Sequence, residues 1–148
     1  MISSILVATD GFDHAEKAVA LAAEIARAPN AGIMLLHAVP SVVLQGIPKG
    51  YEDWADFEHM TVGDILQAVG EDILRCAEKK IRHLGIDDVE CILSSGPAAN
   101  AIVETAKSRK IDIIVMGSRG LSDIESLLLG SVSHKVCQLA PCSCLTVR

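Results

Sequence analysis

The stretch from Ile113 to Val136, "IIVMGSRGLSDIESLLLGSVSHKV", decides the fold. It opens with an apolar run typical of a buried strand and closes with the start of a helix. Between them lie glycines at positions 117, 120 and 130, and Ser131 follows the last of these. A strand, a glycine-containing loop and a helix in this order indicate one unit of an α/β fold.

The rest of the chain repeats the alternation of strand and helix. Strands are predicted at 5–8, 31–39, 88–94, 111–117 and 142–148, and helices from about 13, 61, 97 and 131. Asp10-Gly11 is a common turn pair after the first strand, and Asp13 is expected to cap the first helix. The segment from 40 to about 60 contains several prolines and glycines and is predicted to be irregular.

The longest predicted helix has a start signal, an apolar stripe and a stop signal. Thr61 with Asp64 three residues later resembles a capping box, and Gly85 fits the end of the helix. The expected stripe comprises Ile65, Val69, Ile73, Ala77, Ile81 and Leu84.

Strands that are continuously apolar and alternate with helices predict a parallel sheet covered on both faces. Right-handed crossovers then favour a doubly wound sandwich, and 148 residues suit a single domain over 1–148. In such folds ligands bind at the carboxyl ends of the strands, where the winding direction reverses. Thr9-Asp10-Gly11 and Met116-Gly117 stand at two such ends.

Composition excludes several function classes. The net charge is −6 with acids and bases mixed, so we expect no nucleic-acid partner. No apolar run approaches the roughly 20 residues of a membrane span, and the beginning "MISSILVATD" does not resemble a signal peptide. Five cysteines without an export signal indicate reduced thiols, so we expect a cytoplasmic protein without membrane contact.

The three glycines predict a phosphate site. Gly117 and Gly120 would expose backbone N–H groups beyond the fourth strand, and Gly130-Ser131 would start a helix whose dipole favours an anion. The Ser131 hydroxyl would donate to a phosphate or cap the helix. Arg119 would reach a phosphate or remain a solvated loop residue. Taken singly, these residues are also ordinary turn and cap residues, but their placement at two strand ends favours a nucleotide.

A zinc site is the alternative use of the cysteines. His134, Cys137, Cys142 and Cys144 lie close together in sequence, but their spacing matches no recognised zinc pattern. We therefore expect no metal bound by protein ligands, and buried reduced thiols instead.

The spacing G-x2-G-x9-G-[ST], formed by Gly117, Gly120, Gly130 and Ser131, resembles the ATP-binding type of the universal stress protein family. "ILVATDGFDHAEKAV", "LLHAV" and "SVSHKVCQLAPCSCLTVR" are similar to the family's opening, second strand and close. The resemblance implies an adenine nucleotide alpha hydrolase-like sheet with strand order 3-2-1-4-5. It also implies a homodimer formed through the C-terminal strand.

The resemblance implies a set of nucleotide-binding residues as well. Asp10 and the backbone of Ala38 would hold the adenine, Ala8 and Thr9 would line its pocket, and Met116 and Gly117 would border the ribose. Gly120, Gly130, Ser131 and Val132 would cradle the phosphates of ATP, which would carry Mg²⁺ or Mn²⁺. Three residues depart from the family pattern: Phe12, Ala38 and the pair Ser143-Cys144.

Three functions remain open from the sequence. The first is a nucleotide-dependent regulatory module in stress response, the second a slow ATPase or phosphoryl-transfer enzyme, and the third a ligand-free structural dimer. The loop has no lysine and no evident base, so we assign no catalytic residues and expect at most slow hydrolysis. The glycine–serine signature favours the first function over the third.

Overall fold

A computed structural model describes residues 1–27, 30–41, 61–119 and 129–148. The elements are β1 (Ser4–Ala8), α1 (Asp13–Arg27), β2 (Gly32–Val39), α2 (Val62–His83), β3 (Val89–Ser95), α3 (Ala98–Ser108), β4 (Ile113–Gly117), α4 (Ser131–Leu139) and β5 (Ser143–Val147). The five strands form one parallel sheet in the order β3-β2-β1-β4-β5. The predicted doubly wound sheet and its strand order are confirmed.

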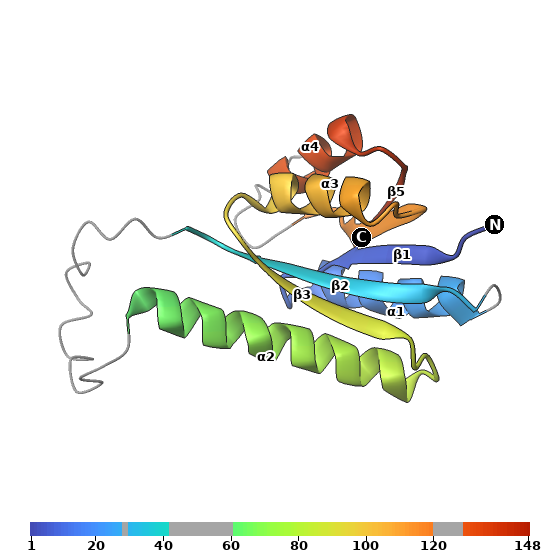
Figure 1. The fold of residues 1–148 in the computed structure, drawn as a ribbon, viewed down its shortest axis with the longest axis horizontal. Helices are drawn as coiled ribbons and strands as arrows, with labels where there is room; N and C mark the ends of the chain where they lie inside the picture. Colours follow the sequence, from blue (N-terminus) through green and yellow to red (C-terminus); the bar gives the residue numbers. More distant parts are fainter. Residues whose placement is uncertain (28–29, 42–60, 120–128) are drawn as a thin grey trace.

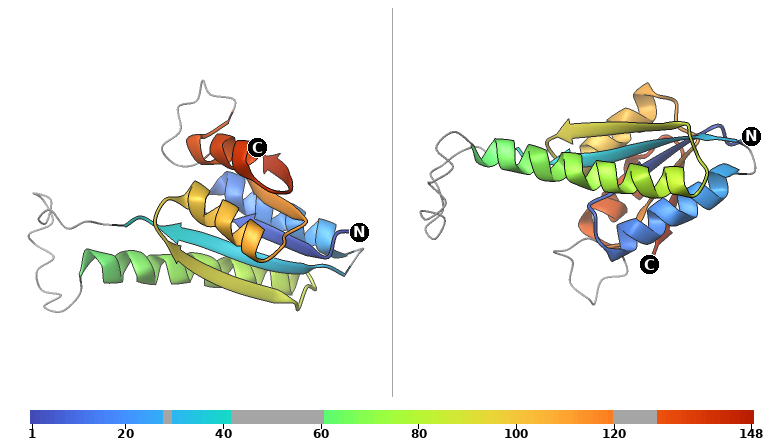
Figure 2. Two further views of the ribbon diagram at one scale, coloured as in Figure 1. Left: turned by 45° about the horizontal axis from the view of Figure 1, so that its top comes forward. Right: turned by 90° about the horizontal axis from the view of Figure 1, so that it is seen from below.

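Helices cover both faces of this sheet (Figures 1 and 2). On one face, Ile5, Val7 and Leu35 pack against the alanine-rich side of α1 and against Leu74 and Ile81 of α2. On the other face, residues of β1 and β4 pack against α3 and α4. Because alternate residues of a strand point to opposite faces, a strand buried on both faces must be apolar throughout.

The ends of α2 agree with the sequence signals. Thr61 is the N-cap, its hydroxyl accepts a hydrogen bond from the Asp64 N–H at 3.2 Å, and the Asp64 carboxylate accepts one from the Thr61 N–H at 2.7 Å. The bond from the Thr61 N–H, and a second one from the Thr61 hydroxyl at 2.8 Å, stabilise the charged carboxylate and lower the pKa of Asp64. Gly85 follows the C-cap with a φ of 89°, the left-handed conformation that suits glycine.

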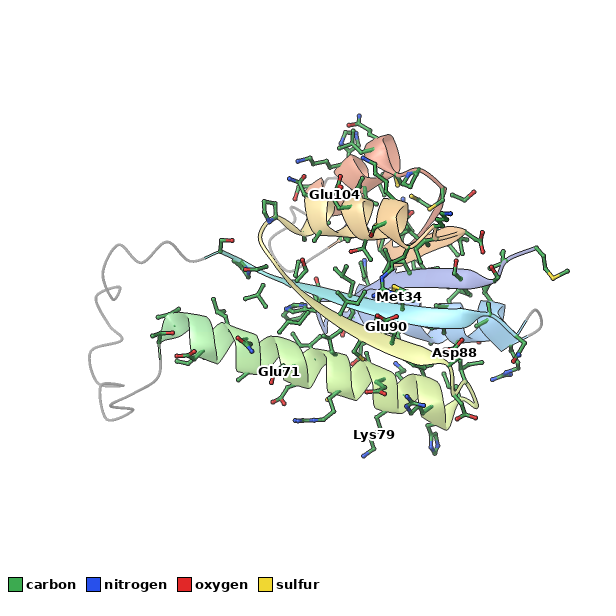
Figure 3. The ribbon with its side chains drawn as sticks, viewed as in Figure 1. Met34, Glu71, Lys79, Asp88, Glu90 and Glu104 are labelled. Carbon is green, nitrogen blue, oxygen red and sulfur yellow. The ribbon has the colours of Figure 1, made fainter. Side chains whose placement is uncertain are left out.

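The apolar stripe predicted for α2 is wrong at its first positions. Ile65 and Val69 are 44% and 50% exposed, whereas Gly70 and Leu74 are buried. Figure 1 gives the reason for Ile65, because the first turn of α2 extends beyond the carboxyl ends of the strands. At the next position along the stripe, Gly70 is the residue that faces the sheet, so the neighbouring Val69 lies on another side of the helix. On the outer side of the same helix, Glu71 and Lys79 point away from the sheet (Figure 3).

Smaller differences concern the ends of elements, which lie within two residues of the predicted bounds. Asp13 is the first residue of α1 and not its cap, and Pro97 precedes α3 as its N-cap. Most of the segment predicted to be irregular, 42–60, lies outside the described residues.

At the amino ends of the strands, hydrogen bonds to Asp112 link the start of β1 to the loop before β4. Its carboxylate accepts hydrogen bonds from the N–H groups of Ser3 and Ser4, at 2.8 and 3.0 Å, and from the Ser3 hydroxyl at 2.8 Å. The bonds from Ser3 and Ser4 lower the pKa of Asp112 to about 2, because they stabilise the charged form.

Candidate functional site

A cavity of about 380 Å³ opens at the carboxyl ends of the strands. It is bordered by the ends of β1, β2 and β4 and by the first turns of α3 and α4. Its volume lies in the range of small-molecule sites, and its position is the one where doubly wound sheets bind ligands. The carboxyl ends of β1 and β4, which were both expected to bind a ligand, therefore border the same cavity.

The structure brings together most of the predicted site residues. The following line the cavity: Ala8, Thr9, Asp10, Ala38, Met116, Gly117, Arg119, Ser131 and Val132. Gly130 is buried at the start of α4, and Gly120 lies outside the described residues.

The loop after β1 is held by its own hydrogen bonds. Gly11 has a φ of 82°, and its N–H donates to the Thr9 hydroxyl at 3.2 Å, while the Phe12 N–H donates to the Asp10 carboxylate at 3.0 Å. Nδ1 of His37 in β2 lies 2.8 Å from the Thr9 carbonyl oxygen. Since a carbonyl only accepts, the proton of this bond sits on Nδ1, and β2 thereby fixes the loop that presents Asp10.

Gly117 is required by packing, which differs from the predicted reason. A Cβ added there would lie 2.9 Å from the Cβ of His14 and 3.0 Å from the backbone nitrogen of Ala15. The missing side chain therefore lets the first turn of α1 approach β4. Gly117 also lines the cavity, but close approach of a ligand is not needed to explain the glycine.

The start of α4 also corrects one expectation. Gly130, and not Ser131, is the N-cap, and no side chain caps the helix there. The Gly130 N–H donates to the Ser118 carbonyl at 2.7 Å, so this amide has a partner within the protein. The first-turn N–H groups of the helix, such as that of Val132, are the donors that a helix start offers to an anion.

Charge is distributed unequally along the cavity. Among the lining residues that the structure describes, Asp10 is the one carboxylate and Arg119 the one guanidinium. The Nε of Arg119 is buried without a hydrogen-bond partner in the described part of the chain. An unpaired buried donor is costly, and a phosphate oxygen is a partner that would satisfy it. The cationic side chain and the helix start thus fit an anionic group.

The cysteines do not assemble into a metal site in the described ranges, where no three His, Cys, Asp or Glu side chains lie close enough to hold an ion. Cys142 and Cys144 are half-buried against the α3–α4 core, whereas Cys137 is exposed, so the prediction of buried thiols is wrong for Cys137. Burial raises the pKa of Cys144 to about 11, with a further contribution from Cys137. Such a thiol stays protonated at neutral pH.

Sequence reasoning missed seven of the sixteen lining residues that the structure describes, among them Ala98, Ile102 and Ser133. Ala98 and Ile102 lie on one side of the first turns of α3, and Ser133 is buried at the start of α4. The i, i+4 spacing of Ala98 and Ile102, directly after a strand end, was an available signal. For Ser133 there was none, because its partners are distant in sequence or lie in the backbone.

Comparisons with known proteins show which family this chain is similar to and which solved structures share its fold. The model of the Universal stress protein family matches residues 1–148. The universal stress protein YxiE of Bacillus subtilis is 35% identical over the whole of both chains, and a Thermus aquaticus universal stress protein is 36% identical over the whole of both.

Among solved structures, a universal stress protein in complex with cAMP is 30% identical, with a TM-score of 0.74 over 99% of this chain and 97% of that one. The Archaeoglobus fulgidus universal stress protein in complex with dAMP is 23% identical, with a TM-score of 0.68 over 100% and 98%. An Arabidopsis thaliana family protein with AMP bound is 22% identical, with a TM-score of 0.67 over 98% and 90%. The last two show likeness of fold alone.

Proposed function

This chain belongs to the universal stress protein family, and from that premise we propose that it binds ATP and acts as a nucleotide-dependent regulatory module in stress response. The observation that carries the proposal is the cavity between β1 and β4, with the start of α4 beside it and, at one side, the buried Nε of Arg119, which has no partner among the residues that the structure describes. The cAMP named for the related structure at 30% identity supports an adenine nucleotide as the ligand, and dAMP and AMP are named for two structures of the same fold.

The charges favour one orientation of the nucleotide. Phosphates would lie over the first turn of α4 and beside Arg119, where the helix dipole and the guanidinium both attract an anion. The adenine and ribose would lie toward Asp10, Ala38 and Met116, away from the cation. Mg²⁺ or Mn²⁺ would be held by the phosphates and water, since these ions retain most of their hydration in such sites.

We place assembly at β5, which lies at one edge of the sheet. An uncovered edge exposes unpaired backbone groups, and pairing two copies about a two-fold axis would satisfy them. Leu145 and Val147 already pack partly against the α1–α2 core, so the backbone of β5 would supply most of the contact. Light scattering is expected to give a dimer of the intact chain, and a stable monomer at micromolar concentration would contradict this interface.

Two further expectations concern domain organisation and cellular location. We expect residues 1–148 to act as one domain and the protein to work in the cytoplasm. None of the helices in the described ranges is long and apolar enough to cross a bilayer.

Slow ATP hydrolysis is the second candidate function. The described cavity lining offers Arg119 for charge neutralisation but no lysine, and Asp10 belongs to the loop after β1, away from the expected phosphates. We therefore expect turnover far below the roughly 1–100 s⁻¹ of kinases. Release of phosphate within that range, by protein free of contaminating ATPase, would favour the enzyme.

Calorimetry with ATP, AMP and adenosine tests the proposal. All three are expected to bind, with affinity rising with phosphate charge, and each should raise the melting temperature because it binds the native state. A ligand-free structural dimer would show neither heat nor a melting shift at millimolar nucleotide. Mass spectrometry of the denatured protein would identify any nucleotide that co-purifies.

A further inference from the structure

Ser118, the residue directly after β4, joins four elements. Its N–H donates to the carbonyl of Val147 at the end of β5, at 2.7 Å. Its carbonyl accepts from the N–H of Gly130 at 2.7 Å and from the hydroxyl of Ser133 at 2.8 Å. Its own hydroxyl lies 3.2 Å from Nδ1 of His14 in α1. With 1% of its surface exposed, Ser118 makes these contacts inside the protein and not with solvent.

Ser133 fixes the start of α4 to this residue. Its hydroxyl proton is shared between the Ser118 carbonyl and the Gly130 carbonyl, which lies at 3.1 Å. Only 3% of Ser133 is exposed, so water cannot readily replace these partners. The two bonds to the Ser118 carbonyl therefore determine how far the first turn of α4 lies from the sheet.

The nucleotide site and the edge strand thus meet at one residue. Gly117 and Arg119, on either side of Ser118, both line the cavity, and so do Ser131 and Val132. On its other side, Ser118 continues the β4–β5 ladder, in which Gly117 is paired with Val147. A group that immobilises Arg119 and the first turn of α4 would also restrain the Ser118 peptide units, and through them the end of β5.

We propose that Ser118 and Ser133, together called the serine relay, are positioning residues that transmit occupancy of the nucleotide site to the carboxyl end of β5. The inference rests on the proposed nucleotide binding and specifies its regulation. Local opening of the Ser118–Val147 bond becomes rarer when phosphate holds the start of α4. Coupling of this kind is reciprocal. The factor by which ATP would raise the affinity for a partner at the β5 edge equals the factor by which that partner would raise the affinity for ATP.

Backbone hydrogen exchange measured by NMR on the full chain, with and without saturating ATP, tests the relay. The probe is the N–H of Ser118, because it donates directly to Val147. In the parent protein we expect ATP to slow its exchange by about tenfold, within the usual range of couplings between sites.

Variants identify the serine that carries the effect. Ser133 also lines the cavity, so Ser133→Ala is measured at an ATP concentration that calorimetry shows to saturate the variant. The change removes a hydroxyl that donates to the Ser118 and Gly130 carbonyls and leaves the backbone of α4 intact, and ATP should no longer slow exchange at Ser118. Ser133→Thr keeps the hydroxyl and should restore the effect. Ser108→Ala is the matched control, since the Ser108 hydroxyl donates only within α3, to the Thr105 carbonyl at 3.2 Å. Because ATP also stabilises the whole native state, its effect at Ser118 is compared with its effect at the N–H of Ile33, which donates to the Asp88 carbonyl at 2.9 Å at the opposite end of the sheet. Slowing at Ser118 beyond that at Ile33 reports transmission.

The outcomes are distinguishable. If the parent gives no heat and no spectral change with ATP, the proposed function is wrong and the relay fails with it. If the parent binds ATP but exchange at Ser118 is unchanged, the relay is wrong and nucleotide binding stands. An undiminished effect of ATP in Ser133→Ala would also overturn the relay. The parent measurement needs no variant, so the test holds even if Ser133→Ala does not fold.

Discussion

Replacing Arg119 with methionine is expected to change ligand binding and stability in opposite directions. Arg119→Met keeps an unbranched side chain as far as the Nε position but removes the guanidinium, and with it the charge and the buried Nε that has no partner among the described residues. Without ligand, the variant should be more stable than the parent, because an unsatisfied buried polar group costs about 1–3 kcal/mol. With ATP, it should lose the hydrogen bond and the charge that the guanidinium gives to phosphate.

The size of the binding loss follows from the same chemistry. A hydrogen bond to a charged group contributes about 1.5–3 kcal/mol, and each 1.4 kcal/mol corresponds to a tenfold change in affinity. Arg119→Met should therefore weaken ATP binding by about ten- to hundredfold. Adenosine, which has no phosphate, should bind both proteins equally.

Calorimetry measures the ATP affinity, and thermal unfolding measures the stability, of the parent and of Arg119→Met. Arg109→Met is the matched control, because Arg109 pairs at 2.6 Å with Glu90 at the exposed opposite end of the sheet. Exposed ion pairs contribute little, so this control should leave both measurements nearly unchanged. Unchanged ATP affinity in Arg119→Met, or an equal loss for adenosine, would refute the assignment of Arg119 to the phosphates.

Three further predictions concern the fold. Thr61→Ala removes the N-cap of α2 and should cost about 0.5–2 kcal/mol in a denaturant titration, while Thr61→Ser should cost little. Gly117→Ala brings a methyl group against α1 and should cost about 1–3 kcal/mol even without ligand; a neutral result would show that α1 can move aside. Asp112 has a lowered pKa of about 2, so its stabilising contribution should be complete above the ordinary value of 3.8 and should be lost as the pH falls through about 2. Above pH 4 the parent should therefore have a larger free energy of unfolding than Asp112→Asn, and near pH 2 the two values should be nearly equal. A difference between the two proteins that stays constant with pH would contradict this.

The sequence predicted the fold well because its signals are local. Apolar runs, the capping box of Thr61 and Asp64, and the glycine at position 85 are each read within a few residues. The strand order came from the family resemblance, since no local pattern states which strands are neighbours.

What the sequence could not predict depends on long-range contacts. The exposure of Ile65 follows from where the sheet ends, which the spacing of apolar residues along the helix does not reveal. The role of Gly117 depends on the approach of α1, and the use of the Gly130 N–H depends on Ser118. Each of these requires knowing which distant residue comes close.

A crystal structure of the protein grown with ATP and Mg²⁺ tests the central claim most directly. We expect phosphate density over the first turn of α4, within hydrogen-bond distance of the Val132 N–H and of Arg119, and adenine density beside Ala38. Nucleotide bound at another place, or an empty cavity at saturating ATP, would contradict the proposed site.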